Sequence, residues 1–259
     1  MTFPETPRVV YERNTLEEVK CQIRFPPILA IDASSPVAFH EAMRFEFPFF
    51  ELKSTIKLPA SVNPNLTKIV ERDLAMMGTK SYSFISEDRT LTLELSKDCL
   101  SLTSRRYERW EAFQKKLEKS LEAFVKVYRP SFFMHTCVRY KNAIRKKPLG
   151  LEAEPWSNLL QPWICGFLAK PETEGGVEAL QTKCVIRLHE GKVEANFAIG
   201  EHQPSKEQAF ILESHIFNDD RKELPDVLPR LDALHGQARL FFRWCVKDEL
   251  HHAMRPRPV

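Results

Sequence analysis

Glycine is scarce in this sequence, and the motifs that depend on it are absent. The eight glycines among 259 residues are scattered, so no glycine-rich loop is available to hold nucleotide phosphates. No G-x-S-x-G nucleophile elbow occurs, and His189-Glu190 is not followed by the second histidine of an H-E-x-x-H zinc site. The sequence therefore indicates no catalytic residue, no metal site and no cofactor.

Closely spaced cysteines and long apolar runs are also missing. No two of the six cysteines form a C-x-x-C pair, which argues against a zinc knuckle or a redox motif. No apolar run is long enough to cross a bilayer, and the first residues lack the apolar segment of a secretory signal. We therefore expect a reduced, cytoplasmic protein without a membrane partner.

The overall composition is that of a soluble globular protein. Hydrophobic residues make up 43% and charged residues 28% of the chain, and eighteen phenylalanines indicate a well-packed core. The net charge of +3 neither requires nor excludes a nucleic-acid partner. A chain of this length forms one large domain or two small ones.

The first half of the chain predicts a strand, a helix, an antiparallel meander and a long helix. Residues 18–25 alternate between apolar and polar, as a half-buried strand does, and Ser34-Ser35-Pro36 provides a helix start. A further strand over 49–58 and a short helix over 66–76 are expected before the meander. The elements of the repeating plan are expected at 18–25, 36–47, 81–86, 90–95, 99–103 and 105–128.

The second half repeats this order. It opens on the strand 132–144, and Glu190-Gly191 is expected to form a tight hairpin turn. The remaining elements are expected at 156–168 and 226–250 for helices, and at 180–189, 192–199 and 209–217 for strands.

The repeat is one of pattern, because residue identity between the halves is poor. We predict an α+β fold made of a duplicated strand, helix, antiparallel meander and long helix unit, with the helices packed on one face of a curved antiparallel sheet. The two repeats are expected at 1–130 and 131–259, joined as one continuous pseudo-symmetric domain. This plan is similar to the saddle of TATA-binding proteins or to a helix-grip fold, a similarity that says little about function.

If the helices cover the apolar face of the sheet, the other face carries alternating polar residues. Arg24 and Arg139 occupy comparable points of the two first strands, and arginine binds phosphate in bidentate fashion. A solvated outer face, which needs no ligand, explains the same pattern. The candidate ligand-binding residues are Lys20, Gln22, Arg24, Glu94, Arg139, Lys183, Arg187, Glu194 and His215.

The block Y-x-x-N-T-L-x-E-V-x-x-Q-x-R-F-P, from Tyr11 to Pro26, resembles the opening signature of a sporadically distributed bacterial protein family. Thr15 departs from it, because the family usually has proline there. Leu212–Phe217 also lacks an expected pair of aspartates. The resemblance implies no catalytic residues, and the patchy distribution suggests an antiviral defence or mobile-element context. Further similar stretches, which extend the resemblance over nearly the whole chain, are Leu100–Thr103, Tyr107–Phe113, Arg139–Ile144 and Phe241–Met254.

From these observations we expect a non-enzymatic binding or interaction component. Another protein, either an operon partner or a second copy of the chain, is the first candidate ligand, and a phosphate-bearing molecule is the second. One alternative is a phosphate-ester or nucleotide-processing enzyme that uses Arg24, Arg139, Arg187 and Glu194 or Glu213. Another is nucleic-acid binding through a saddle-like sheet, which needs a contiguous basic stripe. Convergence of the arginines and glutamates in one cavity would favour the enzyme.

Overall fold

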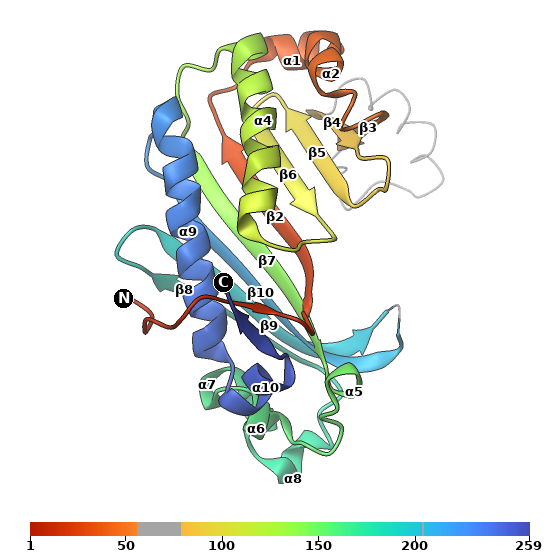
Figure 1. Ribbon diagram of the computed structural model, residues 1–259, viewed down its shortest axis with the longest axis vertical. Coiled ribbons are helices and arrows are strands. Elements are labelled where there is room, and N and C mark those ends of the chain that lie inside the picture. Colours follow the sequence, from red (N-terminus) through yellow and green to blue (C-terminus); the bar gives the residue numbers. More distant parts are fainter. Residues whose placement is uncertain (56–78, 204) are drawn as a thin grey trace, which may run out of the picture.

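Two long helices cover one face of a large antiparallel sheet in the computed structural model of the chain (Figure 1). The structure describes residues 1–55, 79–203 and 205–259. Within these residues the fold is α+β, and the long helices lie on the same side of the sheet, as predicted. The expected helix over 66–76 lies outside the described residues, as does the end of the strand expected over 49–58.

The described strands of the sheet follow the order β3-β4-β5-β6-β2-β7-β10-β9-β8, and β3 and β8 are its two open edges. Every neighbouring pair is antiparallel. The strands are β2 (Leu16–Arg24), β3 (Phe49–Thr55), β4 (Thr79–Ile85), β5 (Leu91–Ser96), β6 (Cys99–Ser104), β7 (His135–Arg145), β8 (Leu180–Arg187), β9 (Lys192–His202) and β10 (Glu207–Asn218). A separate ribbon pairs β1 (Val9–Tyr11) with β11 (Pro256–Pro258).

The long helices are α4 (Trp110–Tyr128), which packs on β6, and α9 (Leu224–Cys245), which packs on β7 and β10. None of the described helices is both long and apolar enough to span a bilayer. The short helices are α1 (Leu29–Ala33), α2 (Val37–Met43), α5 (Lys146–Leu149), α6 (Trp156–Leu159), α7 (Pro162–Cys165), η1 (Gly166–Ala169), α8 (Pro171–Glu174) and α10 (Asp248–Ala253).

The centre of the sheet is the pair formed by β2 and β7, which are the first strands of the two halves. Lys20 faces Arg139 in this pair, although the two residues lie far apart in the sequence. Each strand of the central pair is flanked by the meander of its own half. The last strand of that meander lies next to the centre, and the preceding strands lie progressively further out, as β6-β5-β4 beside β2 and β10-β9-β8 beside β7. The two halves therefore contribute to one continuous sheet rather than to two separate ones.

The core lies between this sheet and the long helices. In α4 the residues Phe113, Leu117 and Phe124 are buried, and they follow the helical spacing seen in the sequence. In α9 the buried face includes Leu231 and Phe241. The apolar residues of each long helix therefore lie on the face that packs against the sheet.

The helix expected over 156–168 is broken into α6, α7 and the 3-10 helix η1. Pro162 opens α7, because a proline is favoured in the first turn of a helix. Gly166 ends α7 with a φ of 54°, which glycine adopts without a steric cost. The apolar spacing of this segment therefore reflects burial and not a single helix.

The helix expected over 226–250 is interrupted as well. It ends at Cys245, because Val246 is extended and forms an isolated bridge with Leu160. The short helix α10 then follows at Asp248. The bridge between Val246 and Leu160 connects the end of α9 to the segment that follows α6.

Candidate functional site

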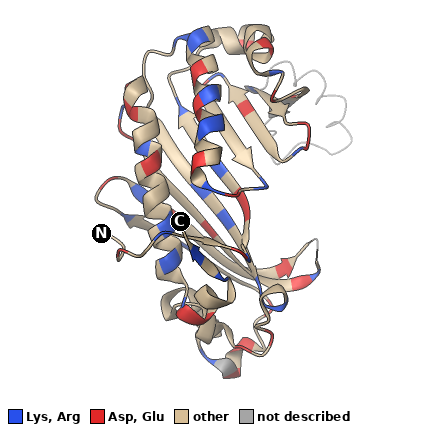
Figure 2. Cartoon of the chain, viewed as in Figure 1, with Lys and Arg blue, Asp and Glu red and all other residues tan. Residues whose placement is uncertain are grey.

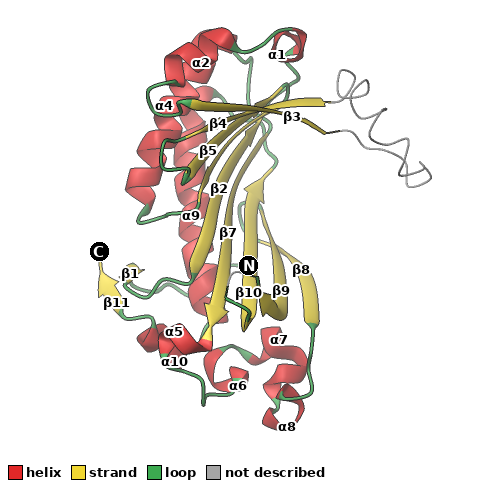
Figure 3. Cartoon of the chain, turned by 90° about the vertical axis from the view of Figure 1, so that its right-hand side faces the viewer, coloured by secondary structure: helices red, strands yellow, loops and turns green. Residues whose placement is uncertain are grey.

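The face of the sheet opposite α4 and α9 is open, and it carries the polar strand residues (Figure 3). In β2, Val19, Cys21 and Ile23 are buried towards the helices, so the residues between them point to this open face. No helix of the described residues lies across it. All the predicted ligand-binding residues occupy the open face: Lys20, Gln22, Arg24, Glu94, Arg139, Lys183, Arg187, Glu194 and His215.

Four of these residues form a row across neighbouring strands. Lys20 faces Arg139, Arg139 faces His215 on β10, and His215 faces Glu194 on β9. Arg187 lies apart from the row, on the edge strand β8. The register therefore brings part of the predicted set together and spreads the rest over the face.

Four basic side chains of the open face pair with carboxylates from other strands or from a turn. Such exposed pairs contribute at most about 1 kcal/mol each to stability, but they reduce the positive charge that a phosphate would meet. Figure 2, which looks onto α4 and α9, shows acidic and basic residues intermixed along the described elements on that side. The pairs are Lys20–Glu94 at 2.8 Å, Arg24–Asp98 at 3.5 Å, Arg139–Glu213 at 3.1 Å and Lys183–Glu194 at 2.6 Å.

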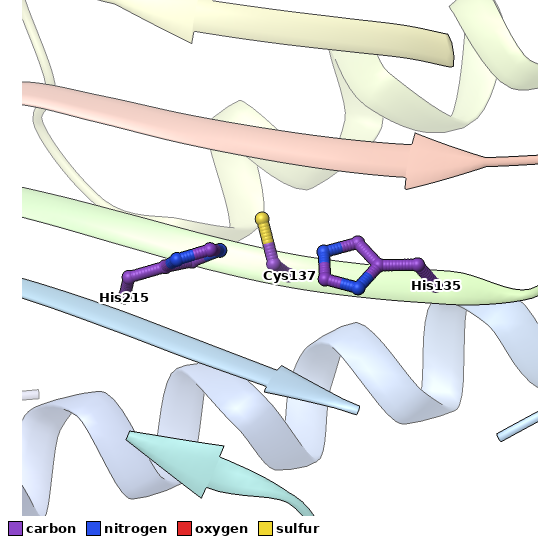
Figure 4. A group of neighbouring side chains, drawn as sticks. All are labelled: His135, Cys137 and His215. Atoms are coloured by element: carbon purple, nitrogen blue, oxygen red, sulfur yellow. The ribbon is translucent and has the colours of Figure 1, made fainter. Parts of the chain in front are cut away.

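A cluster of His135, Cys137 and His215 lies on the open face, with one potential ligand atom from each residue within 4.8 Å of the others. The two imidazole rings approach the Cys137 thiol from opposite sides (Figure 4). Burial raises the pKa of Cys137 to about 12. Burial, followed by the charge of His135, lowers the pKa of His215. We refer to these three residues as the histidine–cysteine cluster.

Sequence reasoning named His215 as a candidate but assigned no role to Cys137. His135 and Cys137 are two residues apart, so the strand alternation already places them on one face. The addition of His215 depends on the pairing of β7 with β10, where His215 faces Arg139. That register cannot be read from a single sequence, and the cluster was therefore missed.

A cavity of about 130 Å³ lies on the other side of the sheet, between the start of α4, the ribbon strand β1 and the middle of α9. We call it the seam cavity, because both halves of the chain line it. None of the nine predicted ligand-binding residues lines it. Its lining consists of Arg8, Val9, Val10, Tyr11, Asn14, Leu16, Tyr107, Glu108, Arg109, Trp110, Tyr140, Asn142, Ser214, His235, Ala238, Arg239 and Phe242.

Aromatic rings form much of the cavity wall. The rings of His235 and Trp110 stack with centroids 4.5 Å apart, and Trp110 donates a hydrogen bond to Asp232. Tyr140 Oη lies 2.7 Å from His235 Nδ1, and Tyr107 packs edge-on against Tyr140. These contacts join Tyr107 and Trp110 of the first half to Tyr140 and His235 of the second half, and they hold the four rings of the cavity wall in place.

Three arginines line the cavity, and two of them also contact other groups: Arg8 pairs with Glu111, and Arg239 pairs with Glu5 and donates a hydrogen bond to the backbone oxygen of Thr6. Arg8, Arg109 and Arg239 line it together with one acidic residue, Glu108. Burial, followed by the positive charge of Arg8, lowers the pKa of His235 to about 4. His235 is therefore neutral at neutral pH, and the cavity combines aromatic walls with nearby positive charge.

The stretches that carried the family resemblance meet at this cavity. Tyr11, Asn14 and Leu16 come from the opening block, and the later stretches supply further lining residues. Trp110 is buried in the core and also forms part of the cavity wall, two roles that helical spacing alone does not distinguish. The cavity-lining residues that come from the later stretches of the resemblance are Tyr107, Arg109, Trp110, Tyr140, Asn142 and Phe242.

No protein-family model matches the chain, and no curated protein matches it either. The family resemblance of the opening block therefore stays a prediction.

The partly buried imidazole of His235 is expected to make the fold less stable in acid. An unfolded chain binds a proton at this residue below about pH 6.5, whereas the folded chain, with a pKa of about 4, resists protonation. The unfolded state therefore gains protons first, and stability falls as the pH drops from 6.5 towards 4. The loss from this residue alone is about 2–3 kcal/mol.

Urea unfolding of the wild type and of His235→Gln at pH 7 and pH 4.5 measures this effect. The charged groups around the imidazole are Arg8, Arg239, Asp232 and Glu111. They remain in both proteins, so the difference between the two pH dependences isolates the histidine. The variant is expected to lose less stability in acid than the wild type. Equal losses in the two proteins would contradict the prediction.

Proposed function

We propose that the protein is a non-enzymatic binding component and that its ligand is a small aromatic anion held in the seam cavity. The observation that carries the proposal is the lining of this cavity by segments from the whole chain. The segment around β1, the approach to α4, the strands β7 and β10 and the helix α9 all contribute to it. A largely apolar pocket with a few convergent polar groups is the usual form of a small-molecule site.

The size of the cavity limits the ligand. A cavity of about 130 Å³ is comparable to one of roughly 150 Å³ that accommodates a benzene ring. One aromatic ring, or two fused rings that extend towards solvent, therefore fits between Trp110, Tyr107 and Phe242. Arg109 and Arg239 line the same space, and guanidinium groups bind carboxylate, sulfonate or phosphate through charge-assisted hydrogen bonds.

The arrangement of the open face supports a binding role over the enzymatic alternative. The enzyme requires Arg24, Arg139 and Arg187 to gather with Glu194 or Glu213 around one substrate. Arg139 instead pairs with Glu213, and Arg187 lies on the edge strand. Nucleic-acid binding through the sheet is disfavoured as well, because Lys20, Arg24, Arg139 and Lys183 of the open face each pair with a carboxylate, which reduces the positive charge available to phosphates.

A protein partner, either from the same operon or a second copy of the chain, extends this proposal. Intermixed and paired charges suit a protein surface of mixed charge better than a polyanion. A defence or mobile-element context follows from the family resemblance alone. Light scattering during size-exclusion chromatography tests self-association, and a monomer at all concentrations would remove the second copy as the partner.

Titration of the protein with 2-naphthoate tests the proposed ligand class. We expect one site per chain, observed by calorimetry and by saturation transfer in NMR. Ala238 is buried in the cavity wall, so Ala238→Phe fills the space and is expected to weaken binding at least tenfold. Ala233→Phe introduces the same ring at an exposed position of the same helix and is expected to bind as the wild type does.

The neutral analogue 2-naphthamide tests the role of the guanidinium groups. The loss of a charge-assisted hydrogen bond of about 1.5–3 kcal/mol corresponds to a roughly 10- to 100-fold weaker affinity. Circular dichroism of both variants controls for folding. Binding that is unchanged in Ala238→Phe, or an absence of binding by the wild type, would refute the proposal.

A further inference from the structure

We infer that His135, Cys137 and His215 form a binding site for a zinc ion on the open face. The donor atoms of the three side chains lie within 4.8 Å of one another. Donor atoms around a tetrahedral zinc ion lie roughly 3.5 Å apart. Small rotations of the side chains about χ1 and χ2 bring the three donor atoms from their present separation to this distance. This inference does not depend on the seam cavity, which lies on the other side of the sheet.

The backbone that presents the cluster is rigid. His135 and Cys137 lie on β7, one of the two central strands, and His215 lies on β10 beside it. Phe217 faces Cys137 across the two strands, and its ring packs against both imidazoles at centroid distances of 5.6 and 5.0 Å. Two paired strands and a shared aromatic neighbour therefore hold the donors in one place.

A carboxylate orients one of the two histidines. Asp219 Oδ1 lies 2.7 Å from His135 Nδ1. An ionised carboxylate only accepts hydrogen bonds, so Nδ1 carries the proton and Nε2 keeps its lone pair for a metal ion. Histidine ligands of zinc usually donate their other N–H group to a carboxylate, a backbone carbonyl or water, which fixes the orientation of the ring.

The charges around the cluster do not oppose a cation. Arg139, the next open-face residue along β7, pairs with Glu213 at 3.1 Å. Arg24 faces His135 and pairs with Asp98 at 3.5 Å, and Glu194 faces His215 and pairs with Lys183 at 2.6 Å. The basic side chains beside the cluster are therefore offset by carboxylates, so little net positive charge opposes a metal ion.

The donor set selects the kind of metal. Two imidazoles and a thiolate are ligands of zinc and of similar transition metals, whereas magnesium and calcium prefer oxygen. Coordination by sulfur releases the proton of the Cys137 thiol to solvent. Three protein ligands leave a fourth position on the open face for water, or for a group of another molecule that contacts this face.

Equilibrium dialysis of the chelator-treated protein against ZnCl₂, with zinc measured by mass spectrometry, tests the site. We expect one zinc ion per chain. Replacement of zinc by Co²⁺ is expected to produce a thiolate-to-cobalt charge-transfer absorption, which reports the bond to sulfur directly. In Cys137→Ser that absorption is expected to disappear, and zinc affinity in Cys137→Ser and in His215→Ala is expected to fall at least 100-fold.

Asp219→Asn changes an exposed carboxylate, so it leaves the core intact. It is expected to weaken zinc binding about 10- to 100-fold while the charge-transfer absorption persists. The matched controls are Cys184→Ser and His189→Ala, whose residues lie outside the cluster; both are expected to bind as the wild type does. The inference is overturned if the wild type binds no zinc, or if binding survives in the double variant Cys137→Ser, His215→Ala.

Discussion

Replacing Phe241 by alanine is expected to destabilise the protein by about 3–5 kcal/mol, the usual range for a buried aromatic side chain. Phe241 is fully buried in α9, at the contact between this helix and two other parts of the chain. Its ring lies 5.3 Å from that of Phe3 and 6.4 Å from that of Phe197 on β9. Its removal leaves a cavity and loosens both the helix and the segment before β1.

Denaturant unfolding, followed by tryptophan fluorescence and by circular dichroism, measures this change. Phe45→Ala is the matched control, because the same ring is 89% exposed there and its loss costs little. A loss below about 1 kcal/mol for Phe241→Ala would show that α9 does not pack on the sheet as described.

Replacing Gly191 by alanine is expected to destabilise the hairpin between β8 and β9, with a loss of about 2–4 kcal/mol. Gly191 has a φ of 106°, a backbone conformation that side chains with a Cβ atom rarely adopt. A Cβ atom at this position would lie 2.2 Å from the carbonyl oxygen of Phe217 on β10. Relief of that contact requires movement of backbone, because no flexible side chain is involved.

Gly200→Ala provides the control for this substitution. Gly200 lies within β9, and a Cβ atom there would meet nothing within 4 Å, so alanine is expected to be neutral or mildly stabilising. Hydrogen exchange should show faster exchange confined to β8 and the adjacent part of β9 in Gly191→Ala. Equal stability of the two variants would contradict the tight approach of the turn to β10.

The sequence predicted the α+β class and the order of the sheet strands and the two long helices in the described residues, because these depend on residues close together in the chain. Lys20 alternates with buried neighbours, and this local pattern was sufficient to place it on the open face. The partner of Lys20 could not be predicted in the same way. Glu94 is 74 residues away, and its contact with Lys20 depends on the registers of β2, β6 and β5.

The two candidate sites differ in how much of each could be predicted. The open face follows from strand alternation, so its residues were identified and only their pairing was not. The seam cavity requires Tyr107, Tyr140 and His235 to meet, and these residues come from a loop, a strand and a helix. No local pattern connects such residues, and each one by itself has the properties of a core residue. The break of the helix expected over 156–168 was missed because burial gives short helices and one long helix the same apolar spacing.

The antiparallel pairing of β2 with β7 is the contact that a two-fold axis produces between equivalent strands of two identical subunits. A symmetric dimer of such halves would have to present the same side chains twice around the axis. A single chain is free of that requirement, so the two sides of the central pair can carry different residues. The seam cavity shows this asymmetry: Tyr107 and Trp110 come from the beginning of α4, whereas His235 comes from the middle of α9. The binding site that we propose in this cavity is therefore unsymmetrical, although it lies beside a pseudo-symmetric strand pair.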